Sequence, residues 1–393
     1  MQKPEQVLES VFGHSEFRPG QKECIEASLS GRDCLAILPT GGGKSIIYQL
    51  PALLKIGTTL VITPLISLMQ DQVQAAQKHG ICAIALNHAT PRHEANKNSN
   101  LLHSGRVKLL YVSPERLSFP AFQEFLGRII ISGIVVDEAH CLAEWGPEFR
   151  PAYLKIGDII KQLRAPVTAC TATATPDTQK EIISGLGLKD PLIYRASFER
   201  KNLFYSVVKK RDDEFQQIAE IAGQGGAGIV YRSTRYQVEE TCRQLVHHGI
   251  NALPYHAGVA PEIKERNQAI FMKNDGTVIV ATIAFGMGID KPNVRWVIHA
   301  DIPKNIEGYY QETGRAGRDG KQAFCTFLFS ERDIPATRQF IDRQTNEKNR
   351  QKQYQQFLEV LSFAKSNQCR TKQILSYFGQ KLSGPCDHCD NCR

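Results

Sequence analysis

The chain has 393 residues, which is enough for two or three domains. With 42% hydrophobic and 22% charged residues, it has the composition of a globular protein that buries a large core. Its 48 basic and 40 acidic side chains give a net charge of +8, a mild excess that permits a nucleic-acid partner but does not require one.

Cysteine usage and hydropathy argue against a disulfide-stabilised protein and against a membrane protein. Seven of the 11 cysteines are scattered, mostly in apolar runs, and we predict that they are core residues, among them Cys34, Cys82, Cys170 and Cys325. A scattered set argues against a disulfide framework and for a reducing compartment. The chain shows no N-terminal signal segment and no apolar run near the roughly 18 residues of a membrane helix. We therefore expect a soluble intracellular protein with no membrane partner.

A glycine-rich loop, Leu38-Pro-Thr-Gly-Gly-Gly-Lys-Ser45, follows the first predicted strand, Cys34–Leu38, and a short helix is expected to open near Lys44. Backbone N–H groups of such a loop converge on an anion, so the predicted phosphate cradle consists of Thr40, Gly41, Gly42 and Gly43. Lys44 would reach the β- and γ-phosphates of ATP, and the Ser45 hydroxyl would hold Mg²⁺. Leu38 replaces the glycine of the strict motif, and the alternative is a strand-to-helix turn that binds nothing.

The stretch Phe12–Gln21, just before this loop, is a candidate adenine pocket. It offers an aromatic residue, Arg18 and Gln21. A glutamine amide both donates and accepts hydrogen bonds, which matches the N6/N7 edge of adenine. A capped turn that leads into a helix explains the same residues equally well.

Further apolar strands alternate with helical stretches along the first half. Such alternation favours an α/β fold, a parallel sheet with helices on both faces. Ligands of these sheets bind at the carboxyl ends of the strands. The strands are predicted at Thr59–Thr63, Lys108–Val112, Gly133–Val136 and Val167–Thr171.

Two adjacent carboxylates end one of these strands, in the run Gly133-Ile-Val-Val-Asp-Glu-Ala-His140. Asp137 is placed to hold Mg²⁺ against the Ser45 site, and Glu138 to orient the water that attacks the γ-phosphate or to accept its proton. His140 could link the site to something outside it. Acidic residues often end strands without any function, but here they follow a phosphate loop.

An aromatic loop follows directly, with Trp145, Phe149 and Arg150. Aromatic rings and an arginine beside an ATP site can stack on unpaired bases, so these residues are candidate DNA contacts. The alternative is an aromatic loop that packs on its own domain.

A second alternating set of strands follows a linker expected around Arg195–Lys201. It has no phosphate loop, but it contains Gln311-Glu-Thr-Gly-Arg-Ala-Gly-Arg318. Arg315 and Arg318 are spaced by one helical turn, so both could neutralise transition-state charge on a γ-phosphate, or they could form a solvated face. Two such halves closing on ATP would make a motor. The second set of strands is predicted at Ala227–Tyr231, Thr277–Ala281, Arg295–His299 and Phe324–Phe329.

The tail carries the other four cysteines, Cys369, Cys386, Cys389 and Cys392, with Cys369 expected on a helix. Four thiolates can close a tetrahedral structural zinc site. His388 is a rival ligand, and an iron–sulfur cluster or a disulfide pair are alternatives.

Taken together, the motifs resemble the RecQ family of DNA helicases, within helicase superfamily two. The resemblance extends from Phe12 to Cys392. Beyond the motifs above, it rests on Thr63-Pro-Leu-Ile-Ser-Leu-Met69, Ser113-Pro-Glu-Arg-Leu117 and Ala281-Thr-Ile-Ala-Phe-Gly-Met-Gly-Ile-Asp290. It implies two tandem RecA-like parallel-sheet domains, at 1–197 and 198–332, and a helical zinc-binding module at 333–393. It also places His140 and Gln311 in the catalytic set, and His14 with Arg18 and Gln21 in the adenine site.

The resemblance implies an enzyme that uses ATP, Mg²⁺ and Zn²⁺ to unwind duplex DNA with 3′-to-5′ polarity, in recombination and repair. Its expected partners are single-stranded DNA and tailed or forked duplexes, with single-stranded-DNA-binding or repair proteins as candidates, and the enzyme is expected to be a monomer. It would act at the nucleoid in the cytoplasm of a bacterium or in a eukaryotic nucleus. Alternatives are an RNA helicase, or a DNA-binding or annealing protein with a vestigial ATPase.

Three departures from the family pattern stand out. His14 replaces the usual adenine-stacking aromatic residue, and Pro147 replaces a histidine common in the aromatic loop. The chain also stops one residue after Cys392, where the family usually continues into a winged-helix domain.

Overall fold

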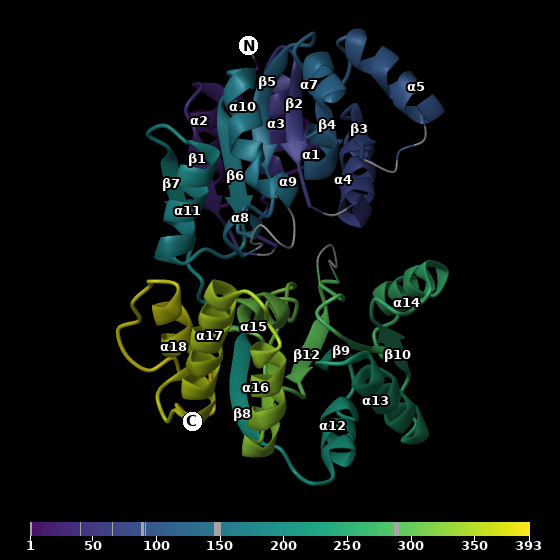
Figure 1. The fold of residues 1–393 in the computed structure, drawn as a ribbon, viewed down its shortest axis with the longest axis vertical. Coiled ribbons are helices and arrows are strands. Elements are labelled where there is room, and N and C mark those ends of the chain that lie inside the picture. The colour runs from purple at the N-terminus through teal and green to yellow at the C-terminus, as the bar shows by residue number, and fades with distance from the viewer. Residues whose placement is uncertain are drawn as a thin grey trace. The chain divides into compact units, whose positions relative to one another are not determined.

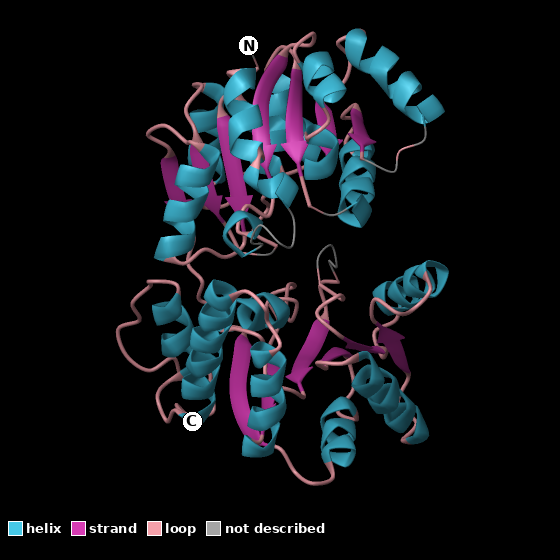
Figure 2. Ribbon diagram, in the orientation of Figure 1, coloured by secondary structure: helices cyan, strands magenta, loops and turns pink. Residues whose placement is uncertain are grey.

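The computed structural model describes residues 2–39, 41–64, 66–87, 90, 92–144, 151–286 and 291–393. The chain divides into two compact units, Met1–Ser197 and Phe198–Arg393, and each unit has its own parallel sheet (Figures 1 and 2). Within the described ranges, no helix combines the length and the apolar character needed to cross a bilayer.

The first unit is built on a sheet that has seven strands among the described residues, in the order β3-β4-β2-β5-β6-β1-β7. All neighbouring strands are parallel. Strands in the middle of the sheet are apolar and buried, because helices cover both of its faces. The strands are β1 (Cys34–Ile37), β2 (Thr58–Ile62), β3 (Ala83–Leu86), β4 (Leu109–Val112), β5 (Ile131–Val136), β6 (Val167–Thr171) and β7 (Leu192–Arg195).

The helices of the first unit fall into packing groups, since α1 and α2 contact α3 whereas α6, α8, α9, α10 and α11 contact one another. Their bounds are α1 (Pro4–Phe12), α2 (Gln21–Leu29), α3 (Ile46–Leu54), α4 (Ile66–Lys78), α5 (Arg92–His103), α6 (Pro114–Leu117), α7 (Pro120–Leu126), α8 (Cys141–Glu144), α9 (Pro151–Leu154), α10 (Ile156–Leu163) and α11 (Pro176–Leu186).

The second unit has a sheet of six strands among the described residues, ordered β10-β11-β9-β12-β13-β8 and again parallel. Its strands are β8 (Leu203–Lys209), β9 (Ala227–Tyr231), β10 (Ala252–Tyr255), β11 (Val278–Ala281), β12 (Val294–His299) and β13 (Ala323–Phe329). Its first helices are α12 (Glu214–Ala222), α13 (Arg235–His247), α14 (Pro261–Lys273) and α15 (Ile306–Thr313).

A helical segment at the C-terminus packs on the same unit. It comprises a short 3₁₀ turn, η1 (Glu331–Asp333), and the helices α16 (Ile334–Asp342), α17 (Glu347–Lys365) and α18 (Arg370–Tyr377). The Phe363 ring of α17 lies 5.5 Å from the Tyr309 ring of α15. The Phe378 ring, just after α18, stacks 4.5 Å from Phe198. The segment is therefore anchored to the second sheet domain by aromatic packing.

The α/β fold class predicted from the sequence is confirmed, and the predicted strands correspond to central strands of both sheets. One detail is wrong: Cys82, predicted to be a core residue, is exposed, whereas Cys34, Cys170 and Cys325 are buried. Cys82 lies just outside the start of β3, where the chain has not yet entered the sheet.

Candidate nucleotide site and zinc centre

The glycine loop connects β1 to α3, as predicted. Gly41 and Gly43 have φ values of +82° and +75°, which side chains rarely tolerate. A Cβ atom on Gly43 would lie 2.4 Å from Nε2 of Gln21. The loop therefore needs glycine both for its backbone shape and for its close approach to Gln21. Ser45 is the N-cap residue of α3, so Lys44 and Ser45 stand at a helix N-terminus.

Arg18 and Gln21 both contact the glycine loop. The Gln21 Nε2 donates to the carbonyl oxygen of Gly43 at 3.0 Å, and its Oε1 accepts from the Arg18 backbone N–H at 2.9 Å. The Arg18 guanidinium donates to the carbonyl oxygen of Gly41. Gln21 is only 1% exposed. Both ends of its amide are engaged by protein, so reading adenine would require exchange of at least one of these bonds.

A surface pocket of about 420 Å³ adjoins this segment, and Phe17, Arg18 and Gly20 are among its lining residues. Gly20 has a φ of +83°, and a Cβ there would lie 2.0 Å from the Tyr194 ring of β7. Glycine is therefore required at position 20 both by the backbone conformation and by the close approach of β7. His14 is exposed and is not among the lining residues.

Asp137 lies at the carboxyl end of β5, where it is 5% exposed. Its Oδ1 accepts the Glu138 backbone N–H at 3.0 Å, and its Oδ2 accepts from Gln72 Nε2 on α4 at 3.1 Å. Burial and the neighbouring Glu138 carboxylate raise the pKa of Asp137, while Lys44 and Gln72 oppose the rise. A bound cation would favour the ionised carboxylate that burial disfavours.

Glu138 has a φ of +49°, in the left-handed region that is strained for a residue with a side chain. Its carboxylate lies 3.4 Å from Nδ1 of His140. His140 is 4% exposed, and its Nδ1 also lies 2.9 Å from the Thr171 hydroxyl at the end of β6. Because that hydroxyl donates to the Thr173 carbonyl at 2.8 Å, the histidine Nδ1 is the donor to Thr171.

The structure thus gathers the predicted catalytic residues of the first unit at one sheet edge. Lys44 lies in the loop after β1, and Asp137, Glu138 and His140 follow β5, with only β6 between these two strands in the sheet. A glycine loop, a lysine, a hydroxyl and a carboxylate form a donor set that suits Mg²⁺ and a nucleoside triphosphate. Thr40, Trp145, Phe149 and Arg150, together with residues 287–290 of the Ala281–Asp290 motif, lie outside the described residues.

In the second unit, the prediction that Arg315 and Arg318 lie one helical turn apart is wrong. The helix α15 ends at Thr313, and the two arginines follow in turns, because Gly317 adopts a φ of +58°. Arg315 is only 8% exposed, and its guanidinium lies near the Tyr231 hydroxyl of β9, where it opposes the burial that raises the pKa of Tyr231. Gln311 lies within α15.

Two residues that sequence reasoning missed hold this arginine loop. The Arg200 guanidinium donates to the carbonyl oxygen of Ala316 at 3.0 Å, and Asn202 Nδ2 donates to that of Gly317 at 2.7 Å. Both residues fall in or beside the segment predicted to be a linker. The run Glu199-Arg-Lys-Asn202 before β8 is polar throughout, so no feature of the sequence singles out these two residues.

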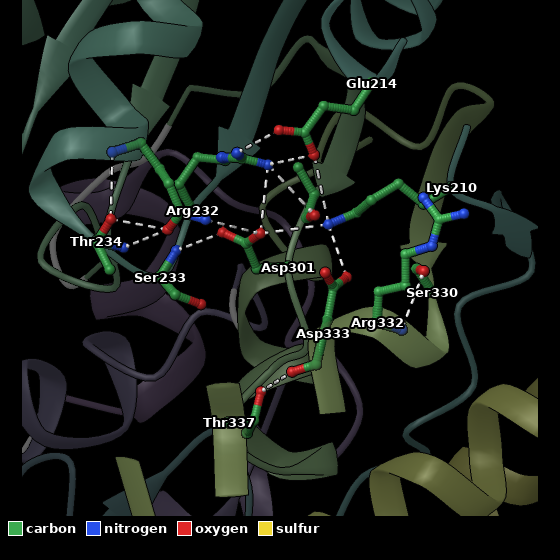
Figure 3. A network of polar contacts seen from close by, with 12 residues as sticks. Lys210, Glu214, Arg232, Ser233, Thr234, Asp301, Ser330, Arg332, Asp333 and Thr337 are labelled. Atoms are coloured by element: carbon green, nitrogen blue, oxygen red, sulfur yellow. Dashed lines mark hydrogen bonds and ion pairs between the residues drawn. The ribbon is translucent and has the colours of Figure 1, made fainter. Parts of the chain in front are cut away.

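The carboxyl edge of the second sheet carries a charge cluster that was also not predicted (Figure 3). Arg232, whose side chain is 2% exposed, pairs with Glu214 at 2.8 Å and with Asp301 at 3.3 Å. Lys210 pairs with Asp333 at 2.7 Å and with Asp301 at 3.4 Å. Although burial opposes it, Arg232 and Lys210 hold the pKa of Glu214 below its usual value. The cluster ties together the chain after β8, β9, β12 and β13.

The four tail cysteines meet as predicted, with all four Sγ atoms within 4.8 Å of one another. Cys386 Sγ and Cys392 Sγ are 3.9 Å apart. Tetrahedral Zn–S bonds of about 2.3 Å require sulfurs roughly 3.8 Å apart, so the geometry suits zinc. The expectation that Cys369 lies on a helix needs a small correction, because it is the N-cap residue of α18. His388 turns its Nδ1 to the Cys386 carbonyl and is not in the cluster.

The cysteine loop also covers the edge strand of the second sheet. Cys389 forms a parallel bridge with Tyr205 of β8, and the Asp390 backbone N–H donates to the Tyr205 carbonyl at 3.0 Å. The Asp390 carboxylate accepts the Val207 backbone N–H at 2.8 Å and pairs with Arg370 at 2.9 Å. Since β8 is the last strand of its sheet, the loop satisfies backbone groups that an edge would leave exposed.

Three family models match the chain in this order. A DEAD/DEAH box helicase model matches residues 18–182, a helicase conserved C-terminal domain model residues 213–320, and a RecQ zinc-binding model residues 331–393. The last match covers all four clustered cysteines, which identifies the cluster as a zinc centre.

Curated relatives match almost the whole chain. It is 42% identical over 98% of its length to the ATP-dependent DNA helicase RecQ of Pasteurella multocida, covering 61% of that protein. It is 39% identical over 100% of its length to the protein of the same name from Bacillus subtilis, covering 67% of it. The chain thus spans about three fifths to two thirds of these relatives, here 61% and 67%.

Solved helicase structures share the fold. The chain is similar to Mss116p bound to ssRNA and AMP-PNP, with a TM-score of 0.70, 17% identity, and coverage of 96% of this chain and 88% of the other. It is also similar to the Mycobacterium smegmatis helicase Lhr bound to ssDNA and AMP-PNP, with a TM-score of 0.65, 20% identity, and coverage of 93% and 52%.

Proposed function

The chain belongs to the RecQ family, and from this premise we propose that it is an ATP-dependent DNA helicase that translocates on single-stranded DNA with 3′-to-5′ polarity. The observation that carries the proposal is the meeting of Lys44, Asp137 and Glu138 at one sheet edge, in a chain that also holds the zinc centre. The relatives it matches are named DNA helicases, and DNA is therefore the proposed substrate.

Each predicted site residue of the first unit has a proposed role in ATP binding or hydrolysis. The glycine loop and Lys44 bind the β- and γ-phosphates, and Ser45 and Asp137 hold the Mg²⁺ that neutralises them. Glu138 orients the attacking water or takes its proton. His140 couples Glu138 to the Thr171–Thr173 segment, because its Nδ1 lies 3.4 Å from the Glu138 carboxylate and its Nδ1–H donates to the Thr171 hydroxyl. Arg18 and Gln21, with His14 as a further candidate, form the proposed adenine site.

The second unit and the aromatic loop complete the proposed cycle. Arg315 and Arg318, with Gln311, neutralise charge on the transferred phosphoryl group. Trp145, Phe149 and Arg150 stack on and pair with single-stranded DNA, which couples DNA binding to hydrolysis. The proposed domains are the ATP-binding RecA-like domain at residues 1–197, the second RecA-like domain at 198–332 and the zinc-binding module at 333–393.

The proposed partners are single-stranded DNA and tailed or forked duplexes, and the proposed working form is a monomer. Its place of action is wherever chromosomal DNA lies, the nucleoid of a bacterium or the nucleus of a eukaryote. An ATP-dependent RNA helicase is the second candidate, because several solved structures of this fold hold RNA. The zinc centre favours the DNA enzyme, since it is the feature that the RecQ model adds to the two helicase models.

The test is the ATPase rate of the purified chain alone, with single-stranded DNA, and with RNA of the same base sequence. We expect DNA to raise the rate at least tenfold, a free energy of about 1.4 kcal/mol. Stimulation by RNA alone would favour the RNA helicase. A folded, zinc-loaded protein without turnover on either polymer would leave only a binding or annealing function.

A further inference from the structure

We infer that Gln72 is a positioning residue for the Asp137 carboxylate, an inference that rests on the proposed ATPase function. Gln72 lies on α4, outside the residues to which that function assigns a role. Its Nε2 donates to Asp137 Oδ2 at 3.1 Å, and its Oε1 accepts from the Tyr48 hydroxyl at 3.0 Å. One side-chain amide thus joins α4 both to β5 and to α3.

The Asp137 carboxylate fixes which way the Gln72 amide points, because it only accepts hydrogen bonds, whereas the Tyr48 hydroxyl can donate or accept. Tyr48 is 2% exposed, so its hydroxyl needs a partner inside the protein. It donates to the amide oxygen, which leaves the NH₂ group of Gln72 facing Asp137. The reversed amide would set its oxygen against a carboxylate, which is repulsive. The Tyr48 hydroxyl therefore satisfies the amide oxygen that faces away from Asp137, and it holds the amide in this orientation from the other side.

A neutral donor suits this position, because it orients the carboxylate and leaves its charge for a cation. With Oδ1 held by the Glu138 N–H and Oδ2 by Gln72, the plane of the Asp137 carboxylate is fixed from two sides. A lysine or arginine at position 72 would instead compete with Mg²⁺ for the negative charge.

The same bridge connects the two proposed Mg²⁺ ligands. Ser45 caps α3, and Tyr48 lies one turn further along that helix. The two hydrogen bonds that join Tyr48, Gln72 and Asp137 therefore link the helix that begins at Ser45 to the end of the strand that positions Asp137. Loss of the bridge should loosen the metal position and leave the phosphate cradle itself intact.

The experiment measures the affinity of a fluorescent ADP analogue, mant-ADP, in Mg²⁺ and in EDTA. Hydrogen bonds to charged groups are worth more than neutral ones, so Gln72→Leu should weaken binding in Mg²⁺ about tenfold and leave binding in EDTA unchanged. Tyr48→Phe, which removes a single oxygen atom, should have a smaller effect of the same kind. The double variant should be little worse than Gln72→Leu alone, because both changes break one chain of bonds.

The matched control is Gln74→Leu, on an exposed position of the same helix, which should match wild type in both buffers. Equal Mg²⁺-dependent affinity in wild type and Gln72→Leu would overturn the inference, as would an equal loss in EDTA. If Gln72→Leu does not fold, an unaltered Mg²⁺ dependence in Tyr48→Phe overturns it. A wild-type protein that binds no nucleotide would instead contradict the proposed function, and the inference with it.

Discussion

The two sheets of this protein use their carboxyl edges in opposite ways. In the first unit, the edge presents a glycine loop with left-handed φ values and a buried carboxylate whose pKa burial raises. In the second unit, the same edge is occupied by two cations and three carboxylates among the described residues, which pair with one another (Figure 3). One edge is shaped for a charged ligand, and the other supplies its own counter-charges.

The comparison shows how one fold serves two purposes. A parallel sheet places the ends of its strands together, whatever residues follow them. Glycines and a lysine at the strand ends make a phosphate site, whereas paired charges there form an ion-pair network that holds the loops together. In the second unit, the charge cluster includes Asp333, and the cysteine loop covers the β8 edge. These two contacts add to the aromatic packing that anchors the zinc-binding segment to the second sheet domain.

Removing the zinc should have the largest effect on the second unit. Zinc binding to small structural sites is worth about 10–16 kcal/mol at neutral pH, so Cys389→Ser should unfold the cysteine loop and uncover β8. An exposed edge strand pairs with other chains, and we therefore expect self-association. Zinc content and size-exclusion chromatography with light scattering measure both effects. The control is Cys82→Ser, at an exposed cysteine outside the cluster. A monomeric Cys389→Ser protein without zinc would contradict the edge-covering role.

Breaking the charge cluster should be the next largest effect. Arg232→Ala leaves Glu214 and Asp301 with Lys210 as their remaining buried cation. We therefore expect a loss of about 3 kcal/mol of unfolding free energy, at the lower end of the range for breaking a buried ion pair. Urea denaturation followed by fluorescence should show the loss in the transition of the second unit. The matched control, Arg243→Ala, removes an arginine that is 70% exposed and should change stability little. Equal stability of both variants would mean that the charge cluster does not stabilise the second unit.

Changes at the first edge should remove chemistry rather than stability. Lys44→Ala and Glu138→Gln should each lower the ATPase rate by about 10²–10³-fold or more, by analogy with removal of one group that stabilises a transition state. Lys44→Ala should also weaken ATP binding, whereas Glu138→Gln should keep ATP bound. Steady-state turnover and nucleotide binding separate the two. Normal hydrolysis by Glu138→Gln would refute the role proposed for its carboxylate.

The smallest predicted effect is at the aromatic loop. Trp145→Ala or Arg150→Ala should leave basal ATPase nearly intact and reduce its stimulation by DNA, since one stacked base is worth about 1–3 kcal/mol. The ratio of stimulated to basal rates is the measurement. An equal fall of both rates would indicate that the loop packs on its own domain.

The strands that the sequence did not reveal are the strands at the edges of the two sheets. Central strands such as β1 and β9 are buried along their whole length and form continuous apolar runs. The edge strands β7 and β10 are half exposed, so their residues alternate weakly or not at all. Burial on both faces made the central strands visible in the sequence, although the edge strand β3 is also largely buried and was not predicted.

Much of the site could be predicted, because its residues lie in compact motifs. The zinc ligands and the Lys44–Asp137 pair were found from residue type and spacing alone. Gln72, Arg200 and the cluster around Arg232 could not be found this way, since no motif marks these residues and their contacts appear only in the folded chain. The helical spacing expected for Arg315 and Arg318 failed because α15 ends at Thr313 and Gly317, between the two arginines, has a left-handed φ.

The most direct test of the account is strand separation on short duplexes with a 3′ or a 5′ single-stranded tail. With ATP and Mg²⁺, we expect the 3′-tailed duplex to be unwound and the 5′-tailed duplex to remain paired, with Glu138→Gln inactive on both. Folded, zinc-loaded protein that binds ATP and yet separates neither duplex would contradict the proposal that this chain is a DNA helicase.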